Sequence, residues 1–131
     1  LRLSAIRYFG RYPDPLARPL LLDFLQDRDP THWEFSAISA SSLARYDGQD
    51  VVDALLQAMN SSNWYIRSNA ASSLEAHGLS YEDMLQVLGG GDRYAREMLT
   101  YRLKAKQLEE EAALAAAEEA NTQREKEPVS V

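Results

Sequence analysis

The chain has no cysteine and only two histidines in 131 residues. Without cysteine it can hold no disulfide bond, thiolate zinc site or cysteine nucleophile. No apolar run approaches the roughly 20 residues that cross a bilayer, so no direct membrane insertion is expected. Alternation of apolar and polar residues, the pattern of a half-buried strand, is missing over any useful length. These absences leave an all-α protein as the predicted fold class.

Basic residues are in the minority, because 14 lysines and arginines stand against 20 acidic residues and give a net charge of −6. Nucleic-acid recognition normally needs a basic stripe, and anionic membranes attract basic segments. The charge balance therefore argues against nucleic acid as a partner. Lysine is absent from residues 1–103 and aromatic residues are absent from residues 104–131, so the composition divides the chain near residue 103.

A short pattern recurs along the first part of the chain. A polar residue is followed three positions later by a small or apolar residue, and four positions after that by a large apolar one. The pattern begins at Arg2, Ser36, Arg67 and Arg96, in steps of 34, 31 and 29 residues. A Leu-Gln pair repeats the last two steps, at Leu25, Leu56 and Leu85. Self-similarity with this period is typical of a solenoid of stacked repeats.

Start and stop signals divide each repeat into two helices. For the first helices we predict a capping box at Thr31 and Glu34 and N-caps at Asn63 and Asp92. For the second helices we predict N-caps at Asp14 with Pro15, at Asp50 and at Ser80. Gly78 and Leu79 fit a left-handed C-terminal cap. The last helix should run from Asp92 to about Ala120, because residues 109–120 are mostly Ala, Glu and Leu.

The sequence Asn63-Trp-Tyr-Ile-Arg-Ser-Asn-Ala-Ala-Ser-Ser-Leu-Glu-Ala-His-Gly-Leu79 resembles the bacterial HEAT-repeat consensus, in which a hydrophobe and an arginine precede Ala-Ala and a leucine. The resemblance covers about residues 1–103 and departs from the consensus at Ser36, where the other repeats have arginine. It implies a right-handed α-α superhelix of HEAT or armadillo type. It also implies that the second helices line the concave face and that the protein acts as a scaffold or binding surface.

We therefore expect about 3.5 helix pairs over residues 1–103 and a charged helical extension over residues 104–131. Residues 121–131 are expected to be frayed or disordered. Leu103, Leu108 and Leu114 do not keep a heptad spacing, so no coiled coil is expected. Because Leu1 already lies inside a repeat, we expect a fragment of a longer protein. A cytoplasmic location is expected, or the soluble part of a membrane-anchored protein.

Some HEAT-like proteins are enzymes or cofactor binders, and their sites have recognisable sequence signatures. Iron-binding members carry His-Glu pairs, but neither His32 nor His77 is followed by glutamate. The glycines at 89–91 lack the Lys-Ser/Thr of a phosphate loop. We expect no catalytic residue, metal or cofactor, and histidines that lie near backbone carbonyls at helix ends. A lyase-like HEAT enzyme or cofactor-binding protein is the alternative.

Two candidate binding surfaces remain. The first is an acidic and amide-rich strip along the second helices: Asp23, Gln26, Asp53, Gln57, Glu82, Asp83 and Gln86. It would suit a cationic or extended peptide, or it is simply a solvated helix face whose amides bond one another. The second is an aromatic patch at the starts of the first helices: Trp33, Trp64, Tyr65 and Tyr94. Such residues are usually buried between repeats, and a partner-binding hot spot is the alternative.

Arg67 and Arg96 are expected to bond carboxylates or loop carbonyls of an adjacent repeat. Taken together, the sequence predicts a non-enzymatic protein–protein interaction or scaffold module. A purely structural segment of a membrane-tethered protein is a further alternative. Exposed apolar side chains at Leu1, Leu3 and Ile6 would favour that alternative, since a solenoid needs a polar terminal cap.

Overall fold

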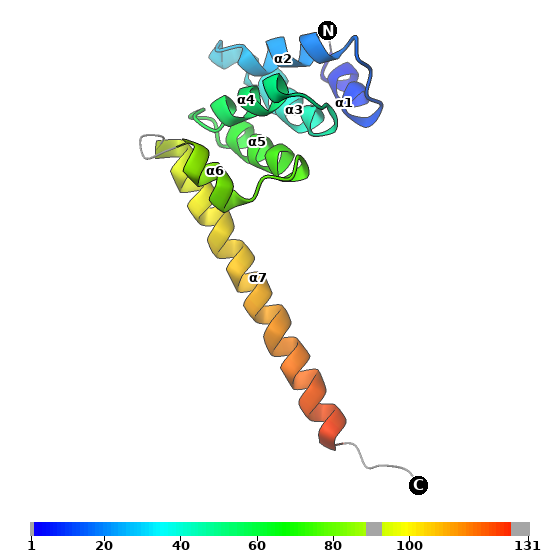
Figure 1. Ribbon diagram of the computed structural model, residues 1–131. Coiled ribbons are helices and arrows are strands. Elements are labelled where there is room, and N and C mark those ends of the chain that lie inside the picture. Colours follow the sequence, from blue (N-terminus) through cyan, green and yellow to red (C-terminus); the bar gives the residue numbers. More distant parts are fainter. Residues whose placement is uncertain (1, 89–92, 127–131) are drawn as a thin grey trace. The chain divides into compact units, whose positions relative to one another are not determined.

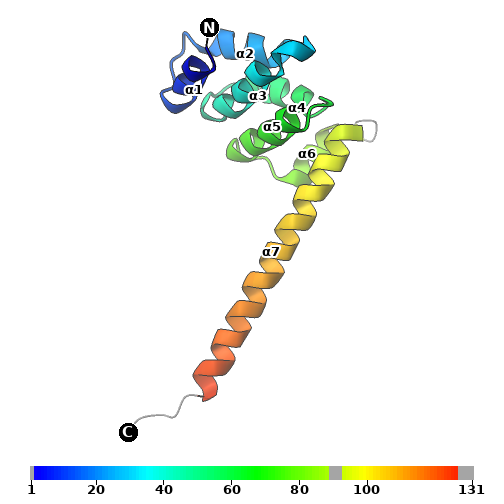
Figure 2. The same ribbon diagram turned by 180° about the vertical axis from the view of Figure 1, so that it is seen from behind.

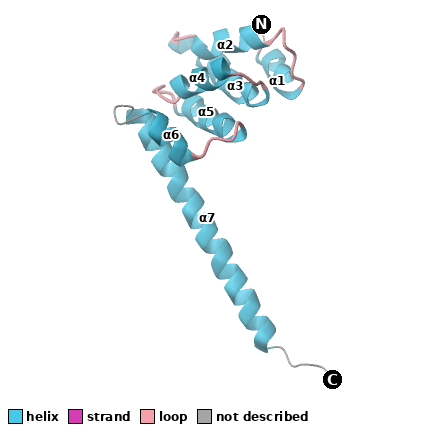
Figure 3. Ribbon diagram, in the orientation of Figure 1, coloured by secondary structure: helices cyan, strands magenta, loops and turns pink. Residues whose placement is uncertain are grey.

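The computed structural model describes residues 2–88 and 93–126, and the statements below concern these residues. Their α-helices are α1 (Leu3–Arg11), α2 (Arg18–Gln26), α3 (Trp33–Ser42), α4 (Gln49–Ala58), α5 (Trp64–Ala76), α6 (Tyr81–Leu88) and α7 (Arg93–Lys126). Two short 3₁₀ helices, η1 (Pro30–His32) and η2 (Leu43–Arg45), flank α3. The described residues contain no strand (Figure 3), so the all-α prediction is confirmed.

The chain divides into two compact units, residues 1–99 and residues 100–131. In the first unit, α1, α3 and α5 lie side by side in one layer, and α2 and α4 pack against them in a second layer (Figures 1 and 2). This arrangement of successive helix pairs in two layers is an α-solenoid. In the second unit, the described residues belong to α7, and none of those classified for burial is buried.

The repeated pattern marks the core of the first unit. Its large apolar positions at Leu43 and Leu74 are fully buried, and so are its small or apolar positions at Ser39, Ala70 and Leu99. Small residues at these positions let neighbouring helices approach closely. The period seen in the sequence therefore follows from one packing interface that is used again in each repeat.

Hydrogen bonds join the α3 segment to α1 and the α5 segment to α3. The Ser42 hydroxyl donates to the Ile6 carbonyl at 3.1 Å, and the Tyr46 hydroxyl donates to the Phe9 carbonyl at 2.8 Å. One repeat later, the Ser73 hydroxyl donates to the Ala40 carbonyl, and His77 Nε2 lies 3.0 Å from the Leu43 carbonyl. Ser42 and Ser73 are equivalent positions, and so are Tyr46 and His77. We call these side-chain-to-carbonyl bonds the ladder.

Several predicted helix ends are confirmed. Asn63 Oδ1 accepts hydrogen bonds from the backbone N–H groups of Tyr65 and Ile66 at the start of α5. Ser80 and Asp83 form a reciprocal capping box at the start of α6. At the end of α5, Gly78 has φ of 94° and the Leu79 N–H donates to the Leu74 carbonyl, which is the predicted left-handed cap.

Three predicted caps are wrong. The Thr31–Glu34 capping box does not form, because Thr31 instead donates to Asp29, which caps η1. Asp14 does not cap α2, since it accepts from the Leu16 N–H in a turn and α2 starts later, at Arg18. Asp50 lies inside the first turn of α4, and its carboxylate pairs with Arg18. Asp92 lies outside the described residues.

The last helix is longer than predicted. Residues 121–126 were expected to be frayed or disordered, but α7 continues to Lys126, and the Thr122 hydroxyl donates to the Glu118 carbonyl at 2.9 Å. Residues 127–131 lie outside the described part. At the other end of the chain, Ile6 is fully buried and Leu3 is partly buried. An exposed Ile6, which would have favoured the purely structural alternative, is therefore not observed.

Candidate partner-binding pocket

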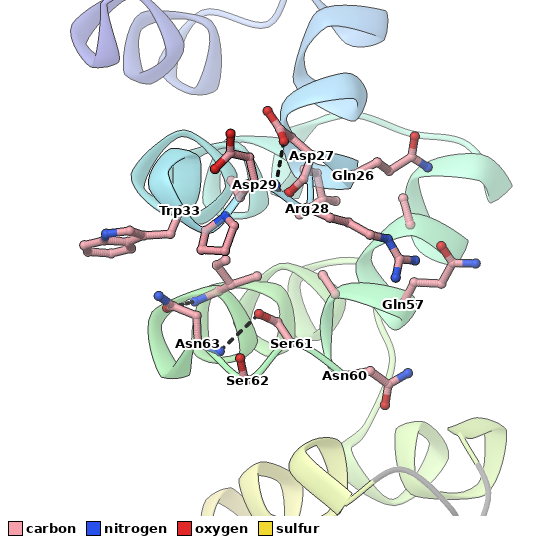
Figure 4. Close-up of a pocket in the computed structure, with 16 residues that line it drawn as sticks. Gln26, Asp27, Arg28, Asp29, Trp33, Gln57, Asn60, Ser61, Ser62 and Asn63 are labelled. Carbon is pink, nitrogen blue, oxygen red and sulfur yellow. Dashed lines mark hydrogen bonds between the residues drawn. The ribbon is translucent and has the colours of Figure 1, made fainter.

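A pocket of about 970 Å³ lies between the α2–α3 loop and the α4–α5 loop, at the edge of the first unit where one helix pair passes to the next. Its lining includes the ends of α2 and α4, the two loops, and the first turns of α3 and α5. Figure 4 shows Gln26, Arg28 and Gln57 on one side of the pocket and the Trp33 indole on the opposite side.

The α2–α3 wall of this pocket is held by a chain of local hydrogen bonds. Asp27 Oδ1 accepts from the Asp29 N–H at 2.9 Å, and Asp29 Oδ1 accepts from both the N–H and the hydroxyl of Thr31. The Ser36 hydroxyl reaches back from α3 and donates to the Phe24 carbonyl at 2.8 Å. This loop is therefore fixed by its own side chains and by the helix that follows it.

The α4–α5 wall is held in a similar way. Arg67 is only 7% exposed, and its Nη1 donates to the carbonyls of Ser61 and Ser62 at 3.0 and 2.9 Å. Its guanidinium also lies 5.1 Å from the centre of the Tyr94 ring. Arg67 and Ser36 occupy equivalent repeat positions. Arg67 bonds carbonyls of the loop just before α5, whereas Ser36 bonds the Phe24 carbonyl near the end of α2. Both side chains thus tie a first helix to the segment before it.

His32 adds an electrostatic contact beside the pocket. Its Nδ1 lies 2.8 Å from Asp27 Oδ2, and its Nε2 lies 3.8 Å from Asp29 Oδ2. The hydrogen bond with Asp27, and next the charge of Asp29, raise the pKa of His32 above 6.5. The Asp29 N–H and then His32 lower the pKa of Asp27, and bonds from Thr31 lower the pKa of Asp29. Both carboxylates therefore already have partners.

Arg28 differs from its two acidic neighbours. It lines the pocket and is exposed, and within the described part of the chain its guanidinium has no ion pair or hydrogen bond. Figure 4 shows its side chain extending between those of Gln26 and Gln57. The pocket thus presents one available cation and two engaged carboxylates, which differs from the acidic strip expected from the sequence.

The structure brings together only part of the predicted strip. Gln26 and Gln57 line the same pocket, whereas Asp23, Asp53, Glu82, Asp83 and Gln86 do not line it. All seven side chains are exposed. Asp53 accepts a hydrogen bond from Gln49, and Asp83 belongs to the α6 capping box. The two glutamines line one pocket because they lie near the ends of α2 and α4, where the two loops border the same space.

The predicted aromatic residues lie largely at the surface. Trp33 and Tyr65 stack across two repeats with ring centroids 5.6 Å apart, and Trp64 meets Tyr65 edge-on at 5.5 Å. Trp64 is 51% exposed and Tyr65 is 58% exposed, so the expectation of burial between repeats is wrong for both. Trp33 also lines the pocket. We call Trp33, Trp64 and Tyr65 the aromatic cluster; Tyr94 instead contacts Arg67 and Arg93.

Sequence reasoning did not single out the loop residues of the pocket. Asp27, Arg28, Asp29 and Asn60 have no helical period that would have marked them. Their place in the chain could have indicated them. Both loops join one helix pair to the next, so in a solenoid they must lie at the same edge. Among the described residues there is no cluster of His, Asp and Glu that could hold a metal ion, and no helix long and apolar enough to cross a membrane.

Comparison with known proteins gives one family match. The family model for HEAT repeats matches residues 1–75 and, in a second register, residues 31–98. The two matched ranges overlap because the repeats resemble one another, so the family model also fits when it is shifted along the chain by one repeat. Among curated proteins, no sequence matches this chain. The match covers the helices that form both walls of the pocket.

Proposed function

The chain belongs to the HEAT-repeat family, and from this premise we propose that it is a non-enzymatic protein-interaction module that binds an extended peptide segment in the pocket between the α2–α3 and α4–α5 loops. HEAT repeats generally mediate protein interactions or scaffolding. One observation carries the proposal: the equivalent glutamines Gln26 and Gln57 line one pocket, together with Asn60 and Asn63.

Side-chain amides suit the backbone of an extended peptide. Each amide offers a carbonyl acceptor and an NH₂ donor, so it can bond both the N–H and the C=O of a peptide group. In the part of the chain that the structure describes, the amides of Gln26, Gln57 and Asn60 make no hydrogen bond. They are therefore available to a partner, which is the opposite of a solvated face whose amides bond one another.

The charge of Arg28 and the aromatic cluster indicate which side chains the bound peptide carries. Arg28 would attract an acidic side chain, and such charge-assisted bonds are stronger than neutral ones. This favours an acidic residue in the peptide over the cationic partner expected from the strip. The aromatic cluster begins at Trp33, on the side of the pocket away from the glutamines, and could receive an apolar side chain. The partner class is thus an extended segment with one acidic and one apolar side chain.

The test uses a displayed library of random peptides selected on the full chain. Selected peptides should bind Gln57→Ala about fivefold more weakly than the parent, because one hydrogen bond contributes about 1 kcal/mol. Gln26→Ala combined with Gln57→Ala should weaken binding further. Gln86→Ala is the matched control, since Gln86 holds the equivalent position but does not line the pocket. Equal affinity of the parent and all three variants would place binding elsewhere and reject the pocket.

A further inference from the structure

In the ladder, the same repeat positions donate hydrogen bonds to carbonyls of the preceding first helix. The equivalent positions in the first repeat lie at the end of α1. Tyr46 and His77 each lie three residues after the large apolar residue of their repeat, and each bonds a carbonyl at the C-terminal end of the preceding first helix: Phe9 in α1 for Tyr46, and Leu43, just after α3, for His77. Arg45 lies two residues after that apolar residue and donates to the Arg11 carbonyl at 2.8 Å. In the first repeat the large apolar residue is Phe9, so the equivalent positions are Tyr12 and Arg11.

These α1 residues have the donors that the ladder needs but no acceptor. Tyr12 is 55% exposed, and Arg11 is exposed as well. Among the described residues, the Tyr12 hydroxyl makes no hydrogen bond, and the Arg11 guanidinium makes no hydrogen bond or ion pair and lies 5.9 Å from the centre of the Tyr12 ring. In the next repeat, by contrast, the equivalent Tyr46 is 5% exposed and fully engaged. The outer side of α1 is thus an unused copy of an interface that the rest of the unit uses.

The charge of this face agrees with its position. Arg2, Arg7 and Arg11 are exposed, and residues 1–13 contain no acidic residue, although the whole chain carries −6. The last carbonyls of a helix carry partial negative charge, and basic side chains near them are stabilising. The α1 face therefore complements the C-terminal end of a helix that runs parallel to it, as α1 does with α3.

We propose that the outer face of α1, formed by Tyr8, Arg11 and Tyr12, is a docking surface for a further helix pair of the same repeat type. The first helix of that pair lies parallel to α1, and its last carbonyl groups accept hydrogen bonds from Tyr12 and Arg11. This interface continues the one between α1 and α3. It is separate from the peptide pocket, which lies between the loops that follow α2 and α4.

Tyr8 is the one departure from the ladder. It occupies the position of Ser42 and Ser73, and its ring packs on Tyr12 with centroids 5.0 Å apart. A tyrosine requires more room than a serine, so the docked helix must carry a small residue opposite it. Inside the unit, the small residue opposite Ser42 is Gly10 of α1. A Cβ added at Gly10 would lie 2.5 Å from Ser42 Oγ.

The test extends the full chain by one repeat. A duplicate of residues 31–65 placed directly before Leu1 keeps the register, because Leu1, Phe35 and Ile66 are equivalent positions. The Leu43 carbonyl of the duplicate then meets Tyr12. We expect one cooperative thermal transition with a Tm at least ~5 °C above that of the parent, since each stacked repeat adds interface stability. The extension is made with and without Tyr8→Ser, so that the size of Tyr8 does not decide the outcome.

Tyr12→Phe removes the hydroxyl that is proposed to donate to the docked helix, so it tests that hydrogen bond directly. It should lower the Tm of the extended chain and leave that of the parent unchanged, whereas Tyr101→Phe, an exposed tyrosine on α7, should change neither. Two separate transitions, or an unchanged Tm in both Tyr8 backgrounds, would overturn the proposal. An equal effect of Tyr12→Phe in the extended chain and the parent would do the same. Self-association of the parent in sedimentation, abolished by Arg11→Glu, would assign the face to a second copy instead.

Discussion

At the scale of single residues, the two histidines show how position decides the task of a side chain. His77 bonds the Leu43 carbonyl and is part of the ladder, as its place at a helix end predicted. His32 also lies at a helix end, but it bonds the carboxylate of Asp27 and not a carbonyl, so the prediction is wrong there. The difference arises because the α2–α3 loop folds back and places two carboxylates beside His32.

The contact between His32 and Asp27 predicts a pH dependence. The pKa of His32 is raised in the folded chain, so the stability from this contact is full below the unfolded value of 6.5 and is lost as pH rises through the folded pKa. The pKa values of Asp27 and Asp29 are lowered, so their contribution is full above 3.8 and is lost as pH falls through their folded pKa values. The loop should therefore be most stable between these two limits.

The measurement is an NMR titration of the two histidine rings. In the parent, His32 should titrate above its ordinary pKa, and Asp27→Asn should lower that pKa because it removes the largest cause of the shift. Asp23→Asn serves as the control, since Asp23 is exposed on α2 and is not among the causes of the shift. A His32 pKa that is the same in the parent and in Asp27→Asn would contradict the hydrogen bond.

At the scale of helices, local signals predicted some helix ends and missed others for an identifiable reason. Asn63, Ser80 and Gly78 act within their own turn, so the neighbouring sequence was sufficient to predict them. Asp50 was expected to cap α4, but its carboxylate pairs with Arg18 from the preceding helix pair. A contact between residues 32 positions apart competes with the cap, and local sequence does not show that competitor.

Gly10 tests how closely α1 and α3 pack. An added Cβ would lie 2.5 Å from Ser42 Oγ and 3.0 Å from the Ser42 Cα. Helix propensity alone predicts that Gly10→Ala stabilises α1 by about 1 kcal/mol. The close approach predicts the opposite sign, a loss of about 1–3 kcal/mol from overpacking.

Urea unfolding of the full chain distinguishes these two outcomes for Gly10. Ser4→Ala, an exposed change on the same helix, is the control and should alter the free energy of unfolding by less than about 0.5 kcal/mol. A more stable Gly10→Ala variant would contradict the close approach of α1 and α3 at Ser42.

At the scale of the whole molecule, the buried side chains define where folding cooperativity resides. Among the residues that the structure describes, every buried hydrophobic one lies between Ile6 and Leu99, within the first compact unit. The described residues after Leu99 form helix with little burial. An unpacked helix of this kind is only marginally stable in water, even with many alanines.

Truncation should therefore separate the two units. Deleting residues 104–131 should shift the Tm of the main transition by less than about 3 °C, because the ΔΔG is small when no buried residue is removed. The helical circular dichroism signal per chain should still fall, since most of α7 is lost. Deleting residues 93–131 is the contrasting variant, because it also removes the buried Ala95, Met98 and Leu99. Equal losses of Tm in the two truncations would contradict this division.

The sequence by itself determined the repeat architecture. The spacing of Arg2, Ser36, Arg67 and Arg96 and the small residues that follow them report one interface used several times, and such a period survives in the sequence because each repeat meets the same packing constraint. It also determined the helix composition of α7 up to about Ala120, because alanine, glutamate and leucine favour helix without tertiary contacts.

Only the tertiary structure decided which polar residues share a site. Gln26 and Gln57 enter one pocket while Gln86 does not, and Arg28 enters it from a loop that has no sequence period. Only the fold revealed that Tyr46 and His77 perform one task, and that Tyr12 holds the same position without an acceptor. The physical reason is that these contacts depend on where neighbouring repeats and their loops come to lie. That placement is set by packing over more than 30 residues of separation and not by local preference.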